Sequence, residues 1–171
     1  MKRKYKLICL FVWINLSVSA QDIVRSFLDK HAQDDNLEIV TIGKKMLGMM
    51  DTLTLDNPDL TEAIKSLETI QIISSKELDL NKEYFNSART LLSKSKKMKE
   101  FFSMSEDDNE LLVMVSESKG YIRELILLSE QQEEFSLISI SGKISLDILL
   151  KYSEGLNIKE LEQLRSVKRN Q

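Results

Sequence analysis

Three apolar segments lie close together in the second half of the chain, and they constrain the fold more than any other feature. They span residues 111–115, 121–128 and 135–140, and only short polar stretches separate them. Connections of this length are typical of tight turns between antiparallel strands. Residues 111–115 and 125–128 are almost continuously apolar, so the middles of these strands are expected to be central in a sheet or covered on both faces.

The first half alternates helical and strand patterns. From Asp22 onward, apolar residues recur at three- and four-residue steps and predict a helix. Residues 37–42 and 67–74 are rich in β-branched side chains and predict two strands. A short helix is expected directly after Gly43, and a longer one to about Ser93. The alternation suggests at least one right-handed crossover unit.

Four further features complete the predicted elements. Asn81 is expected to cap the helix that ends near Ser93. Residues 96–103 could form an edge strand whose lysines discourage further pairing. Residues 144–152 and 157–167 predict two closing helices, and Gly142 is interpreted as the turn between the sheet and the first of them. The expected fold is a single α+β domain over residues 21–171, with a mostly antiparallel four- to five-stranded sheet and helices packed largely on one face.

The N-terminal residues 1–20 have the order of a secretory signal peptide. Four basic residues stand within the first six positions, an apolar run covers residues 7–16, and small residues precede Gln21. The apolar run is too short for a permanent membrane anchor. We therefore expect cleavage after Ala20 and a periplasmic or secreted protein with no integral membrane span.

Removal of this leader changes the charge and the cysteine content. The leader holds four of the 24 basic residues and no acidic residue, so the mature chain has a net charge of about −7. Such a surface is repelled by phosphate backbones, which disfavours nucleic acid as a partner. The only cysteine, Cys9, is lost with the leader. Stability must then come from packing rather than from disulfides.

Motifs for phosphate and metal binding are incomplete. Gly43 and Gly48 have the spacing of a phosphate-binding loop, but methionines replace the lysine and hydroxyl residue that the motif requires. Met46, Met49 and Met50 could offer thioether ligands to cuprous ion. Their helical spacing and the lack of a neighbouring histidine or cysteine favour a role in the core.

Candidate catalytic and ion-binding residues are equally sparse. His31 is the only histidine and is interpreted as a packed or half-exposed structural residue. Two Ser-x-x-Lys matches, beginning at Ser93 and Ser116, lack the partner motifs of acylating enzymes. The acidic cluster at residues 106–110, which includes Asn109, lacks the glycine and glutamate positions of a calcium loop. The basic run Lys94, Lys96, Lys97 and Lys99 is interpreted as a solvated connector, with a local anionic partner as the alternative.

Several segments together resemble a known family. They are Gly120-Tyr121-Ile122-Arg123-Glu124-Leu125 with Leu127-Leu128, the stretch from Leu137 to Leu146, and Gly43-Lys44-Lys45-Met46-Leu47 after a predicted strand. With the leader, they resemble the exported bacterial family described as domain of unknown function 4252. The resemblance implies a small envelope or secreted α+β protein and brings no catalytic residue. The resemblance also implies that some relatives carry a lipidated cysteine. Lipid attachment needs a cysteine at the end of the apolar run, whereas Cys9 lies near its start.

These patterns favour a non-enzymatic, exported envelope protein that acts as a binding or assembly module. No catalytic, cofactor-binding or metal-binding residue is assigned, and no cofactor is expected. The partner is an unknown envelope protein or a small ligand. Two alternatives stay open: a periplasmic carrier of a small apolar ligand, which needs an apolar cavity, and a hydrolase, which needs an acidic residue close to His31.

Overall fold

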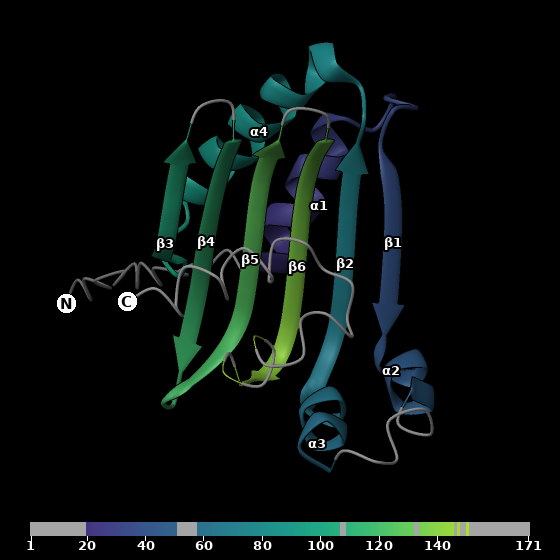
Figure 1. The fold of residues 1–171 in the computed structure, drawn as a ribbon, viewed down its shortest axis with the longest axis vertical. Coiled ribbons are helices and arrows are strands. Elements are labelled where there is room, and N and C mark those ends of the chain that lie inside the picture. The colour runs from purple at the N-terminus through teal and green to yellow at the C-terminus, as the bar shows by residue number, and fades with distance from the viewer. Residues whose placement is uncertain are drawn as a thin grey trace, which may run out of the picture.

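The computed structural model describes residues 20–50, 58–106, 109–131 and 134–145, together with Asp147 and Leu150. Within these ranges the protein forms one six-stranded antiparallel sheet in the order β1-β2-β6-β5-β4-β3, with helices beside it (Figure 1). The predicted α+β class is confirmed. The sheet has six strands rather than four or five because both edge segments, β1 and β3, pair with their neighbours.

The three apolar segments form a meander at the centre and one side of the sheet. It consists of β4 (Asn109–Ser118), β5 (Tyr121–Gln131) and β6 (Glu134–Ile144). The turn between β4 and β5 has Lys119 at φ 55° and Gly120 at φ 79°. Two successive positive φ values suit a two-residue turn that follows the twist of the strands. The predicted strands and tight connection are therefore present.

The first half of the chain supplies the other strands. β1 (Glu38–Gly43) pairs antiparallel with β2 (Leu67–Ser75), and α2 (Lys44–Met50) and α3 (Pro58–Ser66) lie between them in the chain. The first two strands thus form no crossover unit. α4 (Leu78–Ser93) instead connects β2 to β3 (Lys99–Glu106) at the far edge, and these two strands point the same way (Figure 1).

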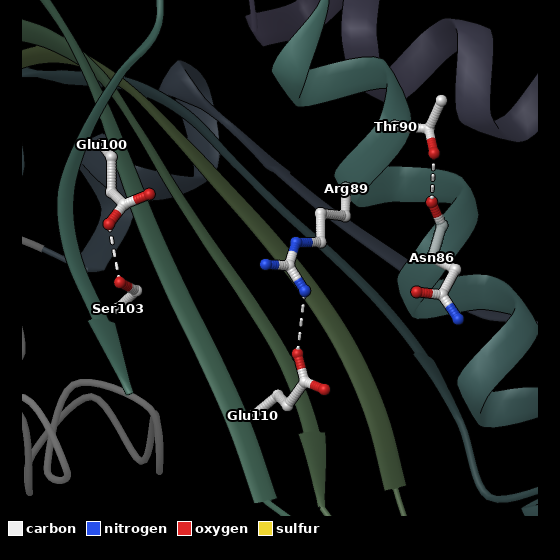
Figure 2. A network of polar contacts seen from close by, with 6 residues as sticks. All are labelled: Asn86, Arg89, Thr90, Glu100, Ser103 and Glu110. Atoms are coloured by element: carbon white, nitrogen blue, oxygen red, sulfur yellow. Dashed lines mark hydrogen bonds and ion pairs between the residues drawn. The ribbon is translucent and has the colours of Figure 1, made fainter. Parts of the chain in front are cut away.

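One face of the sheet is covered by α1 (Ala20–Lys30) and α4 (Figure 1). Apolar residues of both helices share a buried cluster with Ile126, Leu128 and Leu137 of the sheet. Arg89 on α4 adds an ion pair with Glu110 on β4, with 3.2 Å between the guanidinium nitrogen and the carboxylate oxygen (Figure 2). The predicted packing of helices on one face is confirmed for this pair.

The opposite face of the central strands is buried as well. Leu47 of α2, Ile64 of α3 and Leu150 belong to the cluster on this side. Side chains alternate between the faces along a strand, so neighbouring residues join different clusters. Leu127 and Leu128 of β5 illustrate this, because each is 0% exposed and they lie in the two separate clusters. The central strands are therefore covered on both faces, as predicted. The other sheet residues in the cluster of Leu47 and Leu127 are Leu67, Ile70, Leu111, Val113, Val115, Leu125, Ile138, Ile140 and Ile144.

Gly142 does not form the predicted turn between the sheet and a helix. It lies inside β6 at φ 139°, a conformation that side chains rarely allow. A Cβ atom there would lie 2.5 Å from the carbonyl oxygen of Ser66 and 2.6 Å from Cα of Leu67. The Ser66 hydroxyl also donates to the carbonyl oxygen of Lys143 over 2.7 Å. Gly142 therefore allows the junction of α3 and β2 to press against β6.

Asn81 is not the cap of α4, which begins three residues earlier with Glu77 in the capping position. The Asn81 side chain is buried within the first turn. In the amide orientation that suits its neighbours, its nitrogen donates to the carbonyl oxygens of Ser75 and Glu77, over 3.2 and 3.1 Å. Asn81 thus fixes the connection between β2 and α4.

Some sequence predictions fall outside the described residues. The leader is one of them, apart from Ala20, the first residue of α1. The closing helices are also outside, except that Ile144 ends β6 and that Asp147 and Leu150 are helical. No helix in the described part of the chain has the length and apolar character needed to cross a bilayer.

Candidate functional site

Five polar residues meet where the end of α1 and the turn after it pack against α4. They form what we name the interhelical cluster: Lys30, His31, Asp34, Tyr84 and Ser87. Lys30, His31 and Asp34 are at least 50 positions from Tyr84 and Ser87 in the sequence. α1 ends at Lys30, so the following turn can place His31 and Asp34 over the α4 surface.

Ser87 is the meeting point of two of these side chains. Lys30 Nζ donates to Ser87 Oγ over 2.9 Å, and His31 Nε2 lies 3.1 Å from the same oxygen. Burial, followed by the charge of Lys30, holds the pKa of His31 below 6.5. The imidazole is therefore neutral at pH 7. With Nε2 unprotonated, Ser87 donates to His31 while it accepts from Lys30.

Tyr84 and Asp34 make the second link between the helices. The Tyr84 hydroxyl donates to the Asp34 carboxylate, which also accepts from the backbone and side-chain nitrogens of Asn36 over 3.1 and 3.0 Å. The bond from Tyr84 is the main reason that the pKa of Asp34 lies below 3.8. Burial, and then the bond to Asp34, raises the pKa of Tyr84 well above 10. Both shifts favour a charged Asp34 and a neutral Tyr84.

Aromatic rings pack against His31 of the interhelical cluster. The ring centroid of His31 lies 4.7 Å from that of Phe27 and 5.1 Å from that of Tyr84. Phe135 on β6 stacks on Phe27 with 5.6 Å between the centroids. His31 thus lies at the border of the apolar stripe of α1, as its spacing indicated.

Two surface hollows flank the interhelical cluster. One has a volume of about 510 Å³ and the other about 540 Å³, and Lys30 lines both. Both hollows are open to solvent, and most of their lining residues are polar or charged, although carbon atoms form most of the wall of the first. A carrier of apolar ligands needs an enclosed apolar lining with a few polar groups, and neither hollow is enclosed. The other lining residues are Glu83, Asn86, Ser87, Thr90, Leu91 and Lys94 in the first hollow, and His31, Gln33, Asp34, Asp35 and Asn36 in the second.

The cluster contains a serine, a histidine and an aspartate, which raises the hydrolase alternative. However, Asp34 makes its hydrogen bonds with Tyr84 and Asn36, whereas a triad needs the carboxylate to orient the imidazole. Ser87 is buried in the interior of α4, where neighbouring backbone N–H groups donate within the helix. They are not free to stabilise an oxyanion. The geometry is that of a link between α1 and α4.

A second candidate site lies at the edge of the sheet that β1 forms. We name it the β1 edge surface: Ile39, Val40, Met46 and Met49, which are 50%, 52%, 56% and 67% exposed. The interpretation of Met46 and Met49 as core residues is therefore wrong, and the side chain of Met50 lies outside the described part of the structure. α2 lies at the end of β1 (Figure 1), and among its described side chains only Leu47 is buried. Within the described residues, no group of histidine, cysteine and acidic side chains could hold a metal ion.

The two edges of the sheet differ in their protection. β3 carries Lys99 and Glu100 and has a bulge at Phe101, because Glu100 pairs with Met114 and Phe102 with Val113. The bulge brings Glu100 and Ser103 together, and the Ser103 hydroxyl donates to the carboxylate over 2.6 Å (Figure 2). Charges and bulges prevent further strand pairing. β1 has neither a lysine nor a bulge between Glu38 and Gly43.

Other residues singled out in the sequence do not converge on a site. The hydroxyl of Ser93 donates to the carbonyl oxygen of Thr90, and Ser116 is buried in β4. Lys96, Lys97 and Lys99 are exposed around the connection from α4 to β3, while Lys94 lines the first hollow. The link between Tyr84 and Asp34 had no local signal in the sequence.

A family profile described as domain of unknown function (DUF4252) matches residues 31–152, which is more than half of the chain. The chain belongs to the DUF4252 family. The match contains all six strands and α2 to α4, whereas α1 precedes it. The family description carries no activity, so DUF4252 membership assigns no catalytic residue. No curated protein and no solved structure matches the chain.

Proposed function

We propose that the chain is an exported, non-enzymatic envelope protein that acts as a binding or assembly module through the β1 edge surface. The observation that carries this proposal is the contrast between the two sheet edges. β3 is bulged and charged, whereas β1 is regular and half-exposed at Ile39 and Val40. An unprotected edge strand is a template for another strand.

The arrangement of polar and apolar side chains supports binding rather than catalysis. In the interhelical cluster, Ser87 is buried and Asp34 is engaged by Tyr84 and Asn36, so the cluster lacks the geometry of an acyl-transfer site. The hollows beside it are open to solvent and lined mostly by polar or charged residues, which gives little support to a carrier of apolar ligands. Exposed apolar side chains on β1 and α2 leave protein association as the better-supported function.

Affinity capture from an envelope extract tests the binding role. The bait is the full chain expressed in a host that exports it, with Val40→Lys as the edge variant and Ser105→Lys as the matched control on β3. We expect a partner that the wild type and Ser105→Lys retain and that Val40→Lys loses. Absence of any reproducible partner, under conditions that recover known complexes, would contradict the proposal.

Export has its own test. Cell fractionation followed by N-terminal sequencing is expected to find the protein outside the cytoplasm with Gln21 as its first residue. Protein that keeps Met1 and remains in the cytosol would contradict this part of the proposal.

A further inference from the structure

We propose that the β1 edge surface pairs with β1 of a second copy of this chain, antiparallel and around a twofold axis that passes beside Thr41. The two sheets then continue into one sheet of twelve strands. This inference rests on the proposed function, because it names the partner of the same edge.

The backbone of β1 is prepared for such pairing. Its six residues pair with β2 in unbroken register from Glu38 opposite Ser74 to Gly43 opposite Thr69. In an antiparallel ladder, alternate residues direct their N–H and C=O groups to opposite sides of the strand. Every second residue of β1 therefore points these groups away from β2. Within the described residues no strand lies on that side (Figure 1).

Symmetry restricts the register to a few choices. Directly opposed residues in an antiparallel ladder point their backbone groups either both toward each other or both away. Two neighbouring residues point these groups in opposite directions, so they cannot lie opposite each other. In two identical strands around a twofold axis, one residue must therefore lie opposite the same residue of the second copy. Only Val40 or Thr41 in this position leaves five residues of β1 opposite β1 residues of the second copy.

The side chains favour Thr41 on the axis. This register puts Val40 opposite Ile42 of the second copy, so two apolar side chains meet on the same face. It also brings Glu38 next to Lys44, the first residue of α2 in the second copy, and both residues are exposed. With Val40 on the axis, Glu38 would instead face Ile42. Opposite charges therefore meet at both ends of the Thr41-centred pair.

α2 extends the contact beyond the strands. It begins directly after Gly43, so in the antiparallel pair α2 of each copy lies beside the beginning of β1 of the other. Met46 and Met49 are exposed on this helix. Methionine adapts its shape to irregular apolar surfaces, which suits a contact between copies.

Disulfide trapping tests the register. The experiment uses the full chain with Cys9→Ser, so that each introduced thiol is the only one. We expect Thr41→Cys to form a disulfide-linked dimer under mild oxidation, because opposed Cα atoms lie roughly 4.5–5.5 Å apart. Ile39→Cys is the control on the same strand. In this register two Ile39 residues are four positions apart, roughly 13 Å, and should not be linked.

Charge exchange tests the pairing at equilibrium. Sedimentation experiments should find a dimer for the wild type at micromolar concentration. Glu38→Lys and Lys44→Glu should each raise the dissociation constant roughly 5- to 20-fold, because each change alters two symmetry-related pairs. The double exchange should restore dimerisation. A role of either residue in folding alone would not give this rescue.

Two results would overturn the inference. One is a monomeric wild type at all concentrations, and the other is equal disulfide formation by Thr41→Cys and Ile39→Cys. The proposed function is distinguishable from the inference in these experiments. If the wild type is monomeric but captures an envelope partner that Val40→Lys loses, the edge binds another protein and the second copy is wrong.

Discussion

The hydroxyl of Tyr84 donates a hydrogen bond to the carboxylate of Asp34, which joins α4 to the turn that follows α1. The Tyr84 ring is buried against Phe27 and Phe135, so its hydroxyl is held in a fixed position. The same contact lowers the pKa of Asp34 and raises that of Tyr84. The packing of the Tyr84 ring thus positions the hydrogen bond that shifts both pKa values.

Replacement of Tyr84 by phenylalanine isolates this hydrogen bond. The ring remains packed, but Asp34 loses its main stabilising donor, so the pKa of Asp34 should rise toward 3.8. The unfolding temperature should fall by about 2–4 °C. NMR titration of the Asp34 carboxyl and calorimetry measure the two effects. An unchanged Asp34 titration would show that the contact is absent in solution.

Protonation of His31 should make the fold less stable in acid. Its folded pKa lies below 6.5, so the unfolded chain binds more protons in the range between the two values. The His31 contribution is therefore complete above pH 6.5 and is lost as the pH falls through the folded pKa. Urea unfolding between about pH 5 and about pH 8 should be less pH-dependent for His31→Gln than for the wild type. Equal pH dependence in both proteins would contradict the burial assigned to His31.

Alanine at Gly142 should destabilise the protein by about 2 kcal/mol or more, because φ is positive and the added Cβ meets the backbone at Ser66 and Leu67. Gly48→Ala is the matched control. Gly48 is in α2 and has nothing within 4 Å of an added Cβ, so alanine there should stabilise by about 0.5–1 kcal/mol. Chemical unfolding of both variants measures the difference. Similar effects at the two positions would mean that β6 and the α3–β2 junction are less closely packed.

Leu127→Ala and Leu128→Ala compare the two faces of the sheet. Both side chains are fully buried, and each truncation should cost about 2–5 kcal/mol. If the face that contains Leu127 is open to water in solution, Leu127→Ala should cost much less stability than Leu128→Ala. Urea unfolding of the two variants decides between these outcomes.

Much of the sheet could be predicted because its signals are local. The apolar runs of β4, β5 and β6 and the turn at Lys119 and Gly120 are contiguous in the sequence. Where the determinant was a distant contact, prediction failed. Gly142 follows a strand like many turn glycines, but its neighbours in space are Ser66 and Leu67. Asn81 has the residue type of a cap, yet it binds the carbonyl groups before the helix.

The candidate sites were less predictable for the same reason. Tyr84 and Asp34 are 50 residues apart, and neither has a neighbouring motif that indicates the other. The helical spacing of Met46 and Met49 indicated an apolar stripe. A helix as short as α2, placed at the end of the sheet, can bury Leu47 and leave these two methionines exposed. Spacing alone does not say which apolar residues become buried.

The ladder between β2 and β6 sets the order in which the polypeptide can acquire its structure. β2 has β6 (residues 134–144) as its inner neighbour, although residues 76–133 lie between the two strands in the chain. A nascent chain that stops before Glu134 can pair β1 with β2, and β4 with β3 and β5, but it lacks β6, which joins these two halves of the sheet. Pairing over such distances is slow. The two halves can therefore associate only when synthesis is close to finished, which would keep the new polypeptide unfolded for the export that we propose.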